Sequence, residues 1–205
     1  MKLGKKRIHI APVGFEVDRV VIPAVDNKAD KVYLLVHNNK KEDKAGPYAE
    51  RIIKQLKVNK IESETVSVNW RDVESITKAA RRLILEQFGN DIFVNVASGS
   101  KNHAIALDRA IMTLEDQSGI VEFYAEAEKY EGFKPGKQQL STGVKDTKTI
   151  PKRQMILPTG KLRDALSILY KNNLKQEGTC TFPCKEDHPL QAEESKGDGH
   201  MWGSM

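Results

Sequence analysis

The chain of 205 residues contains little cysteine, few aromatic side chains and no long apolar segment. Its two cysteines, Cys180 and Cys184, provide no disulfide framework. No apolar run approaches the roughly 18 residues of a membrane span. The basic N-terminus is not followed by the hydrophobic segment of a signal peptide. We therefore expect a cytoplasmic protein with no membrane partner.

The common nucleotide and hydrolase motifs are also missing. There is no Gly-x-Gly-x-x-Gly after the first expected strand, so NAD or FAD is not expected as a cofactor. The chain has neither the Gly-Lys-Ser/Thr ending of a P-loop nor the Gly-x-Ser-x-Gly of a nucleophile elbow. The net charge of +5 is compatible with an anionic ligand or a nucleic acid and identifies neither.

What the sequence does contain is an alternation of strand and helix patterns. Apolar or alternating runs predict five strands, at residues 7–13, 31–37, 61–69, 92–97 and 120–127. Amphipathic patterns predict helices between them, at residues 16–25, 47–58, 72–88 and 101–116, with Pro23 expected to kink or end the first. This alternation indicates an α/β Rossmann-like three-layer sandwich with a mainly parallel sheet of five or more strands.

A doubly wound sheet binds its ligand outside the carboxyl ends of the strands, where the strand order reverses. If the order is 3-2-1-4-5, that point lies between the first and fourth strands. The loops there are Pro12-Val13-Gly14-Phe15 and Ala97-Ser98-Gly99-Ser100-Lys101, and both contain glycine. The topology therefore predicts a ligand site between these two loops.

The second loop has the features of an anion site. Ser98-Gly99-Ser100 forms a turn of small residues between a buried strand and the helix that begins at Lys101. The free amide groups and the dipole of a helix N-terminus favour an anion. A lysine in the first helical turn opposes that dipole unless an anion is bound. The alternative is a serine N-cap beside a solvated lysine.

The composition divides the rest of the chain into further segments. We expect a Rossmann domain at residues 1–128, a hairpin or linker at 129–156, a small helical segment at 157–190 and a disordered tail at 191–205. Thr159 is a candidate N-cap for a helix over 161–173. Leu162, Leu166 and Leu169 give that helix an apolar face.

Cys180, Cys184 and His188, with His200, are candidate zinc ligands. Their spacing differs from that of the common zinc fingers and ribbons. The alternative is a pair of reduced thiols in the cytosol. We expect no metal.

The segments IHIAPVGFEVDRVVIPAV, ADKVYLLVHNN and FVNVASGSKNHAIAL resemble the CARF domain (CRISPR-associated Rossmann fold). The similarity covers about residues 7–128. It rests on the Gly14-Phe15 turn and the Ser98-Gly99-Ser100-Lys101 turn, and it is strongest to archaeal CARF proteins with a C-terminal winged helix-turn-helix. That family's winged helix has about three helices and a wing, whereas this chain shows one clear helix, so DNA binding stays open.

The resemblance implies a homodimer that binds a cyclic oligoadenylate across its two-fold axis. By position, Val13, Gly14 and Phe15 would lie on the base and ribose side. Ser98, Gly99, Ser100 and Lys101 would hold phosphate, with Asn102 and His103 as further candidates.

Three functional interpretations remain at this stage. The first is a sensor that regulates transcription through its C-terminal region. The second is a metal-independent ring nuclease in which Lys101 and Ser100 support the transition state. The third is a nucleotide-binding protein unrelated to CRISPR signalling.

Four other side chains have interpretations of their own. His9 is expected to be structural, and Tyr124 either packs or stacks on a base. Asp18 and Arg19 are expected to pair on a helix surface.

Overall fold

The computed structural model describes residues 4–132, 139–155 and 160–176. The chain divides into two compact units, Met1–Leu157 and Pro158–Met205, which are described separately here. Thr159 and the candidate zinc ligands lie outside the described residues.

A six-stranded, mostly parallel sheet forms the centre of the first unit. Its order is β3-β2-β1-β4-β5-β8, so β1 and β4 are neighbours and the order 3-2-1-4-5, on which the predicted ligand site depends, is present. The first five strands are parallel, and β8 pairs antiparallel with β5. The strands are β1 (Arg7–Pro12), β2 (Lys31–His37), β3 (Glu62–Val68), β4 (Asp91–Asn95), β5 (Ile120–Glu126) and β8 (Asp146–Thr149).

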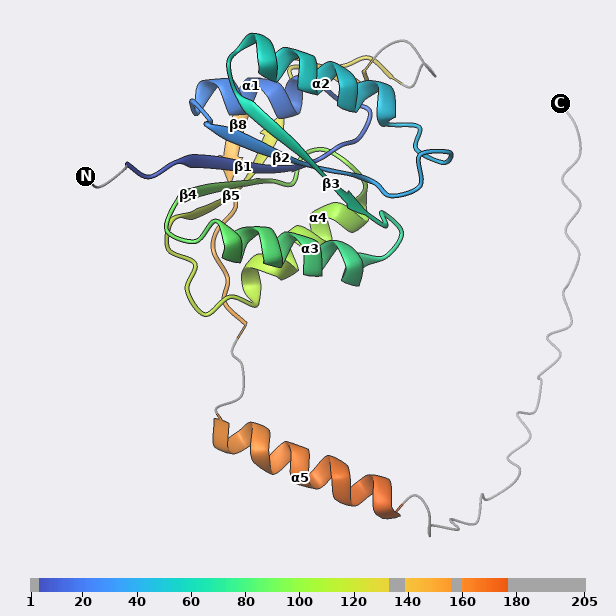
Figure 1. The fold of residues 1–205 in the computed structure, drawn as a ribbon, viewed down its shortest axis with the longest axis vertical. Coiled ribbons are helices and arrows are strands. Elements are labelled where there is room, and N and C mark those ends of the chain that lie inside the picture. The colour runs from blue at the N-terminus through green and yellow to red at the C-terminus, as the bar shows by residue number, and fades with distance from the viewer. Residues whose placement is uncertain (1–3, 133–138, 156–159, 177–205) are drawn as a thin grey trace, which may run out of the picture. The chain divides into compact units, whose positions relative to one another are not determined.

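Helices cover both faces of the sheet (Figure 1). The helices α1 and α2 lie on one face, and α3 and α4 lie on the other. They are α1 (Asp18–Asp26), α2 (Gly46–Val58), α3 (Val73–Glu86) and α4 (Lys101–Met112). This arrangement confirms the predicted three-layer Rossmann-like fold.

Alternate residues of the central strands face opposite helical layers. Ile8 and Ile10 of β1 pack against α3 and α4, whereas Ala11 contributes to the cluster with α1 and α2. On β2, Leu35 belongs to the cluster with α3 and α4, and Leu34 belongs to the cluster with α1 and α2. Burial of both faces fixes the register, because a shift by one residue would exchange the two sets of side chains.

Pro23 neither ends α1 nor lies at its boundary, because the helix continues to Asp26. A proline in a helix removes the N–H that would bond to the carbonyl four residues earlier, here that of Arg19. The Arg19 carbonyl instead accepts a hydrogen bond of 2.8 Å from the buried Asn95 side chain of β4. The proline therefore leaves an acceptor that joins α1 to the sheet.

The chain after β5 stays with the Rossmann unit. Short strands β6 (Lys129–Tyr130) and β7 (Ser141–Thr142) pair antiparallel, and β8 then adds a sixth strand to the sheet. Gln139 lies between β6 and β7 in the sequence, and its side chain accepts hydrogen bonds from the backbone N–H groups of Val17 and Asp18. The N-cap residue Val17 has no polar side chain, so Gln139 satisfies the free N–H groups at the start of α1 in its place.

The described part of the second unit is one helix, α5 (Gly160–Gln176). Leu162, Leu166 and Leu169 are each about half exposed on it. None of the helices in the described ranges is long and apolar enough to cross a membrane.

Candidate functional site

A pocket of about 600 Å³ lies at the carboxyl ends of the first four strands. It includes the point between β1 and β4 at which the strand order reverses. Its lining residues are Val13, Gly14, Phe15, Glu16, Arg19, Val36, His37, Glu42, Asp43, Lys44, Ala45, Trp70, Arg71, Ala97, Gly99, Ser100, His103 and Leu140.

The two predicted loops contact each other through their glycines. A Cβ atom on Gly14 would lie 2.7 Å from the Gly99 backbone nitrogen, closer than real Cβ contacts allow. Gly99 has a φ of +80°, in the left-handed region that favours glycine, and a Cβ there would lie 2.8 Å from Pro12 Cβ. The paired glycines therefore let the β1 and β4 loops approach closely enough to form one wall of the pocket.

Ser100 and His103 organise the start of α4. The Ser100 side chain accepts from the His103 backbone N–H, and the Ser100 backbone N–H donates to His103 Nδ1 at 3.1 Å. This reciprocal arrangement is a capping box in which an imidazole takes the place of the usual Glu or Gln. Burial, with a smaller contribution from the charge of His37, lowers the pKa of His103 to about 4. The imidazole is therefore neutral at physiological pH.

The structure places the predicted ligand-binding residues in three groups. The first group, which lines the pocket, consists of Val13, Gly14, Phe15, Gly99, Ser100 and His103. Ser98 is buried just beneath, and its hydroxyl has no hydrogen-bond partner. The third group, Lys101 and Asn102, does not line the pocket. Lys101 is exposed. The Asn102 side chain donates to the Trp70 carbonyl at 3.2 Å. Asn102 therefore ties the loop after β3 to the first turn of α4.

The expected surface pair of Asp18 and Arg19 is wrong. The Arg19 side chain is only 5 % exposed and donates through Nη1 to both carboxylate oxygens of Glu16, at 2.9 and 3.0 Å. Its Nε donates to the Ala125 carbonyl, and its guanidinium lies over the Tyr124 ring. Asp18 instead accepts from the Gln139 side chain.

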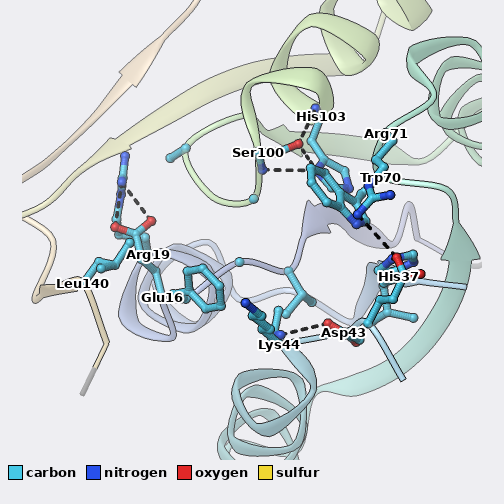
Figure 2. A pocket seen from close by; sticks show the side chains of 18 residues that line it. Glu16, Arg19, His37, Asp43, Lys44, Trp70, Arg71, Ser100, His103 and Leu140 are labelled. Carbon is cyan, nitrogen blue, oxygen red and sulfur yellow. Dashed lines mark hydrogen bonds and ion pairs between the residues drawn. The ribbon is translucent and has the colours of Figure 1, made fainter. Parts of the chain in front are cut away.

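Trp70, Arg71 and His37, all missed by the sequence reasoning, line the end of the pocket away from Glu16 and Arg19 (Figure 2). The His37 and Trp70 rings meet edge to face, with centroids 6.1 Å apart. The Arg71 guanidinium lies over the Trp70 ring and also pairs with Glu42 at 3.4 Å. A Trp and Arg on one loop after a predicted strand is a signal that could have been noticed, because such loops carry the site in this fold.

The carboxylates of the pocket are engaged with the protein itself. Glu16 accepts from Arg19 and from the Ser141 hydroxyl, and Asp43 accepts from the Ala45 backbone N–H. Glu42 pairs with Arg71. The amide end of α4 and the side chain of Lys44 face the same space. No group of three metal-ligating side chains occurs among the described residues.

A family model described as HFX_2341_N:-like, N-terminal, matches residues 7–130. The chain belongs to this family. The match covers β1 to β6, and so includes every residue that lines the pocket except Leu140.

A curated relative of this chain is the uncharacterized protein MJ1513 of Methanocaldococcus jannaschii. The two are 30 % identical over 128 residues, which are 60 % of this chain and 38 % of MJ1513. The chain thus spans less than half the length of that relative.

Two solved structures are similar to the fold. Csm6 of Enterococcus italicus, bound to cyclic hexa-2′-fluoro-hexa-dAMP, matches with a TM-score of 0.52 and 13 % identity, over 85 % of this chain and 48 % of Csm6. Can2 of Sulfobacillus thermosulfidooxidans, in complex with cyclic tetra-adenylate, matches with a TM-score of 0.46 and 20 % identity, over 58 % of this chain and 31 % of Can2. The likeness to Csm6 shows that the two proteins share a Rossmann-like fold.

Proposed function

We propose that the protein is a sensor that binds a cyclic oligoadenylate in the pocket at the carboxyl ends of β1 to β4. The observation that carries this proposal is the meeting of Gly14 and Gly99 beside the capped N-terminus of α4, inside a pocket that Trp70 and Phe15 also line. Helix amides suit a phosphate, and aromatic side chains suit a base. The resemblance of the two loops to the CARF domain and the cyclic nucleotide bound to Csm6 support the same ligand class.

We propose that the sensor is a homodimer. A pocket of about 600 Å³ is within the size range of sites for one drug-sized ligand. A cyclic oligonucleotide is larger and has rotational symmetry, so two copies of the pocket related by a two-fold axis would match it.

The direct test is a calorimetric titration of the protein with cyclic tetra-adenylate, with recovery of the ligand afterwards. We expect binding of one ligand per two chains and recovery of the intact ring. A linear product would favour the ring nuclease, in which Ser100 and Lys101 are the first residues to substitute. Absence of binding would contradict the proposed ligand.

Lys101 gives a prediction that separates ligand binding from folding. Its exposed cation opposes the dipole of α4, so Lys101→Ala is expected to leave stability unchanged or raise it by about 0.3–1 kcal/mol. Affinity for the ligand should fall by about tenfold, because one charge near the phosphates is lost. Titration calorimetry and thermal unfolding measure the two effects.

Lys54→Ala, at an exposed lysine more than two turns from the N-terminus of α2, is the matched control and should change neither quantity. Equal affinity of Lys101→Ala and the wild type would remove Lys101 from the site.

We further propose that the region beginning with α5 transmits the bound state to DNA. The exposed Leu162, Leu166 and Leu169 require a packing partner, as in the first helix of a larger output region. A gel-shift assay on DNA upstream of its own gene, with and without ligand, tests this step. A mobility that does not depend on ligand would contradict it and leave ligand binding unaffected.

A further inference from the structure

Two histidines that line the pocket each have a buried ring nitrogen with no hydrogen-bond partner. These atoms are Nε2 of His103, on α4, and Nε2 of His37, at the end of β2. His103 is 4 % exposed, and the His37 side chain is 9 % exposed. The nearest carboxylate oxygen to His37 Nε2 belongs to Glu42, at 3.9 Å, beyond hydrogen-bond distance. A buried polar atom without a partner is costly, so its retention in a residue that lines a pocket points to a ligand.

The protein determines which nitrogen of His103 carries the proton. A backbone N–H can only donate, and that of Ser100 points at His103 Nδ1 from 3.1 Å. In the neutral ring Nδ1 is therefore the acceptor, and Nε2 carries the hydrogen. The unpartnered atom is a donor.

His37 is held in the same tautomer by different residues. The Asn39 backbone N–H donates to His37 Nδ1 at 3.1 Å. Asn38 Oδ1 lies 2.9 Å from the same nitrogen. Because the Asn39 N–H requires Nδ1 to accept, the Asn38 amide turned by 180° presents its NH₂ group there instead. His37 Nε2 is then also an N–H donor that lacks an acceptor.

We infer that His37 and His103 are specificity residues whose Nε2–H groups donate to two acceptor atoms of the bound ligand. The inference rests on the proposed function and adds the chemistry of recognition to it. The two donors come from separate elements, β2 and α4, so a ligand must present acceptors to both of these elements at once. Phosphodiester oxygens and the ring nitrogens of adenine are such acceptors. Because His103 is neutral, it selects a ligand by hydrogen-bond geometry and not by charge.

Asparagine substitutions test this inference while retaining the local structure. The Oδ1 of asparagine occupies a position close to Nδ1 of histidine, so it can accept the Ser100 or Asn39 N–H, but asparagine has no atom at the Nε2 position. We expect His37→Asn and His103→Asn each to weaken cyclic tetra-adenylate binding by about tenfold, as for one lost hydrogen bond in a buried site. Their melting temperatures should stay close to that of the wild type.

Nitrogen NMR of the wild-type imidazoles supplies a readout independent of folding. In the free protein His37 and His103 should show the Nε2–H tautomer, and both Nε2 signals should move when cyclic tetra-adenylate is added. His9 is the internal control, because its Nε2 is equally buried and unpartnered but does not line the pocket.

The outcomes separate the two proposals. A wild-type protein that does not bind cyclic tetra-adenylate would overturn both. If the wild type binds, but both asparagine variants retain its affinity or the two Nε2 signals stay fixed, the inference fails and the proposed function stands. Weaker binding together with ligand-dependent signals at His37 and His103, and none at His9, would support it.

Discussion

Replacing Glu16 by alanine is expected to destabilise the Rossmann unit by about 3–5 kcal/mol, the cost of leaving a buried charge without its partner. The Arg19 guanidinium is almost fully buried, and Glu16 is the carboxylate that accepts from its Nη1. The same substitution also removes the acceptor of the buried Ser141 hydroxyl, at 2.7 Å. Urea unfolding at pH 7 measures the change as a lower midpoint.

An exposed ion pair and a double substitution serve as controls. Arg82 and Glu86 are paired on α3 with both side chains more than half exposed, so Glu86→Ala should cost less than about 1 kcal/mol. If the unpaired charge causes the loss, Glu16→Ala/Arg19→Met should be more stable than Glu16→Ala alone. Additive losses in the double variant would contradict this explanation.

The same pair shows a limit of sequence reasoning. A charged residue in a short helix is usually exposed, so Glu16 and Arg19 gave no sign that they would lie at the end of the pocket. Their burial depends on Ser141 and Ala125, which are more than 100 positions away along the chain. Contacts between such distant residues have no local pattern in the sequence.

The parts of the fold that repeat a local pattern were predictable. Five strands and four helices followed from apolar periodicity. The strand order was assumed from the doubly wound fold, and with it the Gly14 and Gly99 loops were expected to meet. The strand β8 was harder to predict from the sequence. Asp146–Thr149 is polar and exposed at every position, so its sequence does not distinguish a sheet edge from a separate hairpin. Hydrogen bonding to β5 places it in the sheet.

The site was predictable where it depends on topology and less so where it depends on side-chain direction. Six of the nine predicted residues line the pocket, because the ends of β1 and β4 must meet there. Lys101 and Asn102 follow in the same helix, but a helical turn directs successive side chains to different faces. Asn102 consequently contacts the Trp70 loop, and Lys101 is exposed. The third residue outside the lining, Ser98, lies beneath it.

Acid should weaken the fold through His9, and His9→Leu should remove that contribution to the pH dependence. His9 is 2 % exposed, its ring stacks on Phe93 at 4.8 Å, and burial lowers its pKa to about 4. Above pH 6.5 the ring is neutral whether the chain is folded or unfolded, so it contributes no pH dependence. Between pH 6.5 and 4 the unfolded chain binds a proton that the folded chain does not. The free energy of unfolding therefore decreases as the pH is lowered through this range. The full loss is about 3 kcal/mol at pH 4.

The measurement is urea unfolding of both proteins from pH 8 to pH 4. The stability of His9→Leu relative to the wild type should rise by about 3 kcal/mol as the pH falls from 7 to 4. A difference that stays constant across this range would show that His9 has the same pKa in the folded and unfolded states.

Glu122 provides a control of opposite sign in an overlapping pH range. Burial, with a smaller contribution from Asp108, raises its pKa to about 7, so the folded state binds a proton before the unfolded state does. The wild type therefore gains stability from this carboxyl as the pH falls from 7 to 4.5. Glu122→Gln should be more stable than the wild type at pH 8, and this advantage should disappear at low pH. The advantage of His9→Leu should instead appear at low pH, so a general effect of acid on the protein could not produce both results.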